Sequence, residues 1–251
     1  MKNENLAFGI DISRYNTSPD GKQKVDFDRM DQHTPTVSFI SMRAGISWGY
    51  QDPWFAYYFQ EAGRIRKPRM PYHVLYPGEN PTAQMDHFFR ILGEVDFNKI
   101  MLVLDLELDH GQSKSTITRA VIQSVKILTE RTGKNPILYS RAGWVNQFLQ
   151  VADLPPVFWW LAQYRFSLPY PLYTPEYPSP PTLPKGVAEW TFHQTSCRGK
   201  SIAAPCAYYM DYNRFNGDES ALEQFFIVED AQPIICPVDQ QLCCRIFKNE
   251  R

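Results

Sequence analysis

Two carboxylates, Asp105 and Glu107, lie two residues apart at the end of the apolar run at residues 100–108. Its unbroken hydrophobicity is typical of a buried strand. Residues i and i+2 of a strand point to the same face, so both acids should point one way while the leucines between them pack on the other side. Crowding of two like charges raises the pKa of one of them. A carboxylic acid that keeps its proton near neutral pH is what cleavage of a glycosidic bond requires.

The composition favours a soluble globular protein. The 251 residues are 43% hydrophobic and 21% charged, which provides enough apolar material for a sizeable core. A formal net charge of -1 offers no basic surface, so neither nucleic acid nor a membrane is expected as a partner. No run approaches the ~18 apolar residues of a membrane span, and no signal peptide is visible at the N-terminus. We therefore expect synthesis in the cytoplasm.

The cysteines are confined to the last quarter of the chain. They are Cys197, Cys206, Cys236, Cys243 and Cys244. Their odd number precludes complete intramolecular pairing, and their spacing does not match a zinc site. Reduced thiols without a function are the favoured interpretation, and a disulfide between Cys197 and Cys206 is an alternative. No metal and no cofactor are expected.

Eight segments have the length and apolar content of short strands, and nearly all end in a polar or ionisable residue. They are residues 6–13, 37–43, 70–76, 100–107, 136–139, 157–163, 188–194 and 207–213. Helical patterns separate the first five, at residues 25–33, 54–66, 82–93, 115–132 and 142–150, and a last helix is predicted at 219–226. Alternation of this kind predicts parallel strands joined by right-handed crossovers.

The alternation stops after the sixth strand. Residues 166–186 contain seven prolines and predict an irregular loop, and residues 195–206 are too short and too polar for a good crossover helix. The pattern therefore predicts an α/β fold, a single TIM-like barrel with parallel strands that lacks its last helices and carries its site at the carboxyl rim. A doubly wound open sheet is the alternative. No Gly-rich loop follows a strand, which argues against nucleotide binding.

Closure of a barrel would bring polar and aromatic strand ends together at one rim. These residues are Asp11, Arg43, Tyr72, His73, Asp105, Glu107, Tyr139, Gln163, Gln194 and Asp211. Asp11 on the first strand and Asp211 on the last would be neighbours where the barrel closes. Each acid alone could form a turn or pair with an arginine, but four acids from three strands are hard to explain as solvated surface. The expected site is concave and acidic, and it is lined by aromatic rings.

Short motifs in a fixed order resemble the glycoside hydrolase family 25 muramidases, the Chalaropsis-type lysozymes of phage endolysins, bacteria and fungi. The motifs are Gly9-Ile-Asp-Ile-Ser, Phe39-Ile-Ser-Met-Arg-Ala-Gly, Asp52-Pro-Trp-Phe, Pro71-Tyr-His-Val-Leu-Tyr, Leu104-Asp-Leu-Glu, Ile137-Leu-Tyr-Ser, Trp160-Leu-Ala-Gln-Tyr, Trp190-Thr-Phe-His-Gln and Met210-Asp-Tyr-Asn-Arg-Phe. The resemblance implies a (β/α)5(β)3 barrel domain at residues 1–227, followed by an extension of unknown role at 228–251. The segment Met42-Arg-Ala-Gly-Ile-Ser departs from the Lys-Ala-Thr-Glu-Gly that family members often carry.

The resemblance further implies an enzyme that hydrolyses the β-1,4 bond between N-acetylmuramic acid and N-acetylglucosamine in peptidoglycan of the bacterial cell wall. We expect a monomer. Glu107 would be the general acid and Asp105 would assist the 2-acetamido group as nucleophile, or else Asp11 or Asp211 would activate water. The candidates for sugar binding are Arg43, Tyr72, Tyr139, Trp160, Gln163, Tyr164, Trp190 and Gln194. Two alternatives stay open: a chitinase-like barrel glycosidase, and a catalytically silent glycan-binding or virion structural protein.

Overall fold

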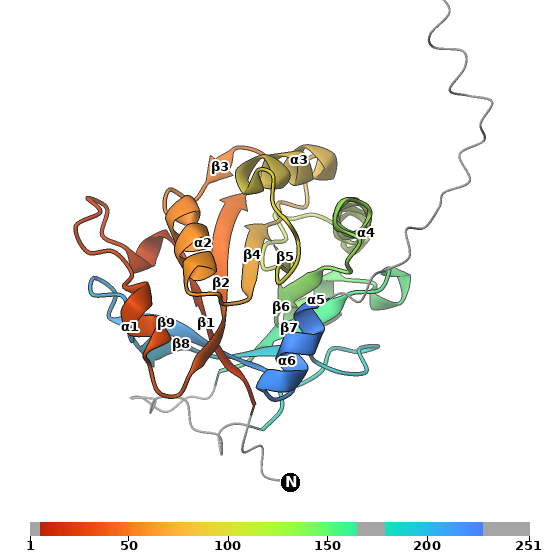
Figure 1. Ribbon diagram of the computed structural model, residues 1–251. Helices are drawn as coiled ribbons and strands as arrows, with labels where there is room; N and C mark the ends of the chain where they lie inside the picture. Colours follow the sequence, from red (N-terminus) through yellow and green to blue (C-terminus); the bar gives the residue numbers. More distant parts are fainter. Residues whose placement is uncertain (1–5, 165–178, 228–251) are drawn as a thin grey trace, which may run out of the picture.

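Eight strands close into a barrel in the computed structural model, which describes residues 6–164 and 179–227 (Figure 1). Their order around the barrel is β1 (Phe8–Ile12), β9 (Tyr209–Phe215), β8 (Phe192–Lys200), β7 (Phe158–Ala162), β6 (Ile137–Ser140), β5 (Val103–Asp105), β4 (Arg69–Val74) and β2 (Val37–Ile46), and β2 pairs with β1. The two-residue strand β3 (Tyr50–Gln51) forms a hairpin with the end of β2. The predicted (β/α)5(β)3 barrel is confirmed. The extension 228–251 and most of the proline-rich segment lie outside the described residues.

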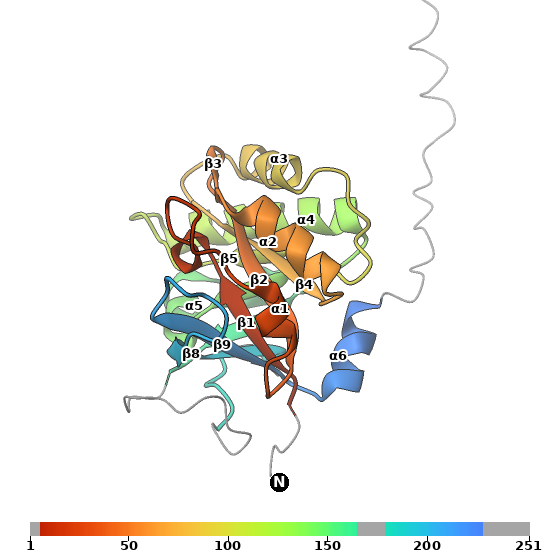
Figure 2. The same ribbon diagram turned by 60° about the vertical axis from the view of Figure 1, so that its left-hand side comes forward.

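The helices surround the strands in both views (Figures 1 and 2). They are α1 (Phe27–Asp31), α2 (Phe55–Arg64), α3 (Pro81–Leu92), α4 (Lys114–Thr132), α5 (Ala142–Phe148) and α6 (Glu219–Phe226), with 3-10 turns η1 (Arg14–Asn16) and η2 (Val151–Asp153). Local capping sets their ends. The Ser113 hydroxyl accepts from the Thr116 N–H where α4 begins, and Gly133 ends α4 in the left-handed region at φ 72°. No helix in the described ranges is long and apolar enough to cross a membrane.

The last strand differs from the expected direction. The pairings among β1, β2 and β4 to β8 are parallel, whereas β9 is antiparallel to both of its neighbours, β1 and β8. Residues 201–208 are too few for a crossover, which needs a dozen or more, so they form a hairpin instead. The reversal brings the start of β9, with Asp211, to the rim where the parallel strands end.

Alternate side chains of each strand enter two separate hydrophobic clusters. On β5 and its flanks, Leu104 and Leu106 join the cluster between barrel and helices, while Val103 joins the cluster inside the barrel. The inner cluster crowds the backbone, and a Cβ at Gly9 would meet the Phe39 ring at 2.4 Å. Side chains of α6, including Phe226, complete the inner cluster at the end of the barrel away from the acids. The inside of the barrel is therefore a packed core with room for polar residues at one rim.

The disulfide considered between Cys197 and Cys206 is absent, because both cysteines are free thiols. The other three cysteines lie outside the described residues.

Candidate active site

A cavity of about 170 Å³ opens at the carboxyl rim of the barrel. It is lined by four acids, four aromatic rings and one amide: Asp11, Asp105, Glu107, Asp211, Tyr72, Tyr139, Trp160, Tyr164 and Gln194. The structure thus brings together all four predicted acids and five of the eight predicted sugar-binding residues. As predicted, different strands supply the residues that line the cavity. They lie on β1, β4, β5, β6, β7, β8 and β9, or in the segments directly after β5 and β7.

The two acids of the Asp-Leu-Glu motif differ in their surroundings. Asp105 is the last residue of β5 and is 8% exposed, and its Oδ1 has no hydrogen-bond partner among the described residues. Burial raises the pKa of Asp105 well above its usual value, and the charges of Glu107 and Asp11 add to that effect. The Glu107 side chain is 35% exposed, and its Oε1 lies 3.1 Å from Nη2 of Arg141. Burial more than crowding therefore distinguishes the two acids.

Asp11 and Asp211 face each other where β1 pairs with β9, as predicted. Oδ2 of Asp11 accepts hydrogen bonds from Nε2 of Gln194 and Nδ2 of Asn213, both at 2.8 Å. Burial raises the pKa of both acids. At Asp11, hydrogen bonding to Asn213, Gln194 and Asp211 opposes this rise in pKa. At Asp211, the charge of Asp11 raises the pKa further. The two carboxyls therefore titrate as a pair, and burial raises the pKa of both.

Gln194 connects the acids to the aromatic wall. Its Oε1 accepts from the hydroxyls of Tyr139 at 2.7 Å and Tyr164 at 2.5 Å, while its Nε2 donates to Asp11. Burial is the main cause that raises the pKa of both tyrosines, so they stay neutral donors. Because oxygen and nitrogen of the amide each have a fixed partner, the orientation of Gln194 is determined by this network. The wall on this side of the cavity is pre-organised before substrate arrives.

Three predicted sugar-binding residues do not line the cavity. Oε1 of Gln163 accepts from the Thr182 N–H at 2.5 Å, which directs that side chain away from the acids. Trp190 precedes β8, at the end of the barrel opposite the rim, and its ring packs on Arg214 with the guanidinium carbon 5.2 Å from the ring centre. The prediction that Trp190 lines the site was wrong, because β8 begins only at residue 192 and Trp190 belongs to the outer cluster.

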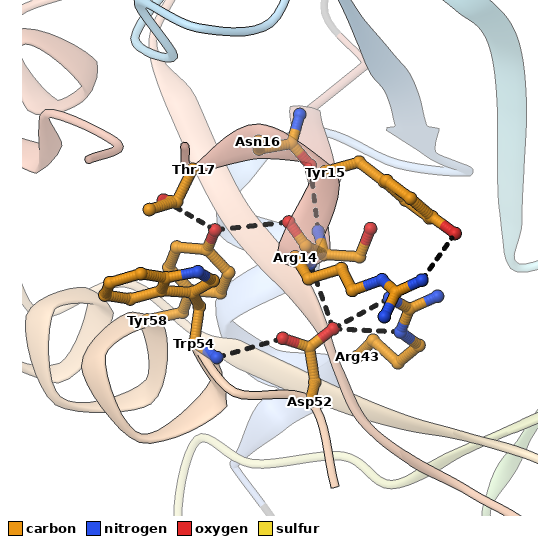
Figure 3. A network of polar contacts seen from close by, with 9 residues as sticks. Arg14, Tyr15, Asn16, Thr17, Arg43, Asp52, Trp54 and Tyr58 are labelled. Atoms are coloured by element: carbon orange, nitrogen blue, oxygen red, sulfur yellow. Dashed lines mark hydrogen bonds and ion pairs between the residues drawn. The ribbon is translucent and has the colours of Figure 1, made fainter. Parts of the chain in front are cut away.

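Arg43, the third of these, pairs with a buried carboxylate beside the cavity (Figure 3). Its Nε and Nη2 both lie 2.9 Å from Oδ2 of Asp52, whose side chain is 0% exposed. The same carboxylate accepts from the backbone N–H of Arg14 at 2.9 Å and of Trp54 at 3.0 Å. Asp52 therefore joins Arg43 on β2 to η1 and to the start of α2, and the charge of Arg43 opposes the rise in the pKa of nearby Asp105.

The sequence did not single out Asn213, Arg141 and Asp52 as site residues. Asn213 follows Asp211 by two residues on β9, so the same alternation that placed the acids could have found it. It also accepts from Nε1 of Trp160 at 2.9 Å. Arg141 is the first residue after β6, at the rim. Asp52 follows the β3 hairpin, which has no signal in the hydrophobic pattern.

Comparison with known proteins agrees with the geometry. The family described as glycosyl hydrolases family 25 matches residues 10–201. The uncharacterized protein YegX of Escherichia coli O6:H1 is 29% identical over 226 residues, which cover 86% of this chain and 72% of that protein. Lysozyme M1 of Streptomyces globisporus is 26% identical over 199 residues, 74% of this chain and 62% of that protein.

Solved structures share the fold at lower identity. The bacterial lysozyme from Streptomyces coelicolor superposes with a TM-score of 0.70 at 24% identity, covering 87% of this chain and 95% of that one. The family GH25 lysozyme from Aspergillus fumigatus gives a TM-score of 0.70 at 22% identity, covering 89% and 100%. With the family match over most of the barrel, this chain belongs to glycosyl hydrolase family 25.

Proposed function

We propose that this protein is an N-acetylmuramidase of the bacterial cell wall, which hydrolyses the β-1,4 bond between N-acetylmuramic acid and N-acetylglucosamine in peptidoglycan. The observation that carries the proposal is the cavity itself, where Asp105 and Glu107 stand with Asp11 and Asp211 in an aromatic wall. Family membership and the lysozymes among its relatives support this substrate.

Glu107 is the general acid in this proposal. It is the more accessible of the two motif acids, so its carboxyl can reach the glycosidic oxygen of a chain lying across the rim. When the proton passes to the leaving oxygen, Glu107 becomes negatively charged. Arg141, whose Nη2 lies 3.1 Å away, compensates that charge.

Asp105 serves the nucleophile, which is the carbonyl oxygen of the muramyl 2-acetamido group. Its unpartnered Oδ1 is free to accept the acetamido N–H, and that contact turns the carbonyl oxygen toward the anomeric carbon. As the carbonyl oxygen bonds to that carbon and the glycosidic bond breaks, positive charge develops on the amide. The negative charge of the Asp105 carboxylate, directed at this amide, stabilises the intermediate. Water activated by Glu107 then opens it, with net retention.

Direct activation of water by Asp11 is less well supported. Oδ2 of Asp11 already accepts from Gln194 and Asn213. A general base needs a free lone pair directed at the water. We therefore assign Asp11 and Asp211 to positioning the wall of the site, and expect the newly formed reducing end to be the β-anomer.

The test is digestion of purified peptidoglycan by wild type, Glu107→Gln and the control Glu223→Gln, which changes an exposed acid on α6. Reducing ends are trapped with borohydride and identified by mass spectrometry. We expect new muramitol ends from wild type and the control, and at least about 100-fold fewer from Glu107→Gln. New glucosaminitol ends would mean that the other glycosidic bond is cut. Full activity of Glu107→Gln would contradict the acid assignment.

A further inference from the structure

A second hollow, of about 800 Å³, lies beside the hairpin of β8 and β9. Its charged lining is Arg29, Arg198 and Lys200, and its aromatic lining is Tyr208 and Tyr209, which are 86% and 47% exposed. No carboxylate lines it, and none of the three cations forms an ion pair with any residue in the described ranges. Three uncompensated cations in one concave surface predict a negatively charged ligand. We call this surface the basic groove.

The basic groove adjoins the catalytic cavity along one strand. Tyr209 and Asp211 are two residues apart on β9, so they share a face and are separated by about 7 Å at ~3.4 Å per residue. Lys200 pairs with Tyr209 across the hairpin, which places the cation at the same level. The groove and the cavity therefore share β9, with Tyr209 in one lining and Asp211 in the other.

Part of the groove is lined by small apolar residues. Beside Ser201, it is lined by Ala203, Ala204, Pro205 and Ala207, none of which has a charged side chain; Ala203 and Ala204 are nearly buried, so Pro205 and Ala207 offer most of this apolar surface. A ligand that fits such a surface combines carboxylates with small apolar side chains. A polyol phosphate has the charge but no methyl groups to cover the alanines, so a peptide suits this groove better.

We propose that the basic groove binds the stem peptide that the muramyl lactyl group carries, a proposal that rests on the proposed muramidase function. Free carboxylates of the peptide would pair with Arg198, Lys200 and Arg29, while its alanine methyl groups lie on this apolar surface. The stem begins at the muramic acid next to the bond that is cut, which matches the short distance from Asp211 to Tyr209. The groove thus makes the enzyme prefer glycan that bears peptides over bare glycan.

Calorimetric titration with a soluble disaccharide-peptide, and with the same disaccharide without peptide, tests this directly. The protein variants are wild type, Arg198→Glu/Lys200→Glu, and the matched control Arg119→Glu/Lys126→Glu, which makes the same charge change on exposed positions of α4. We expect the groove variant to bind the disaccharide-peptide about 10-fold more weakly and the bare disaccharide unchanged. The control variant should bind both like wild type.

Three outcomes would overturn the inference: equal affinity of wild type for both disaccharides, equal weakening of both in the groove variant, or equal weakening by the control. A glycerol phosphate oligomer and the free stem peptide are compared as competitors of the bound disaccharide-peptide. If the oligomer displaces it at the lower concentration, the groove binds phosphate polymers instead. Cleavage of intact peptidoglycan is measured separately. Peptide-dependent binding without cleavage would refute the muramidase function while the peptide site stands.

Discussion

Replacing Asp52 by asparagine tests how the rim beside the cavity is stabilised. The variant keeps the shape of the side chain, but removes the charge opposite Arg43, whose side chain is only 11% exposed. Loss of one partner of a buried ion pair costs about 3–5 kcal/mol, because the other charge stays buried without compensation. The amide oxygen of the new side chain can still accept from the Trp54 N–H, so we expect the lower end, about 3 kcal/mol. The melting temperature should fall by about 6–12 °C.

Urea denaturation of wild type and Asp52→Asn measures the change in free energy of unfolding. The matched control is Asp86→Asn, since Asp86 pairs with Arg131 at the surface with side chains 45% and 41% exposed, and should cost less than about 1 kcal/mol. A double variant, Arg43→Met/Asp52→Asn, should recover part of the loss because no buried charge remains. A loss at Asp52→Asn no larger than the control, or a double variant less stable than Asp52→Asn, would refute the reasoning.

Three further predictions concern the site. The raised pKa of Asp211 means that the fold is stabilised when this acid is protonated; the stabilisation is complete below the usual pKa of 3.8 and is lost as the pH rises toward the raised value. Relative to wild type, Asp211→Asn should therefore gain free energy of unfolding between about pH 4 and pH 7. A difference in urea denaturation that does not change with pH would contradict this. Trp160→Phe removes the N–H that donates to Asn213 and should lower kcat/KM about 5-fold or more. The control Trp190→Phe changes a residue of the outer cluster and should lower only the melting temperature. Equal losses of kcat/KM in the two variants would show that the cavity is not the active site. A bulky thiol reagent on exposed Cys197, whose pKa is raised by burial and by the nearby charge of Asp211, should inhibit wild type but not Cys197→Ser.

Much of the barrel could be predicted from the sequence because its strands and helices have different hydrophobic periods. The helix predicted at residues 115–132 is observed at Lys114–Thr132, where its cap and terminal glycine are local signals. The direction of β9 was less accessible, since an apolar strand looks the same in either direction. Only the shortness of the connection before it, which was visible in the sequence, favours the hairpin.

The site was predictable to the extent that strand alternation determines it. Asp11, Asp105 and Asp211 each follow an apolar strand pattern, and all three line the cavity. Trp190 and Gln163 could not be excluded in advance. The segment predicted at 188–194 becomes β8 only from Phe192, and the segment predicted at 157–163 ends as β7 at Ala162, so both residues lie outside the strands whose alternation determines the face. The Arg43 pairing with Asp52 depends on a loop, and loops leave no periodic trace in the sequence.

Because β9 is the last strand of the barrel along the chain, the cavity can be completed only late during protein synthesis. Asp11 is bound by Asn213, 202 residues further along the chain, and by Gln194, 183 residues away. At ~5–20 residues per second, a ribosome needs roughly 10–40 s to make Asn213 after Asp11 has been polymerised. Gln194 and Asp211 are made shortly before Asn213, so until the end of that interval Asp11 lacks at least one of these three neighbours. Nascent chains that stall before β9 therefore carry the Asp-Leu-Glu motif without a complete site, and hydrolytic activity reports only on chains whose two ends have met.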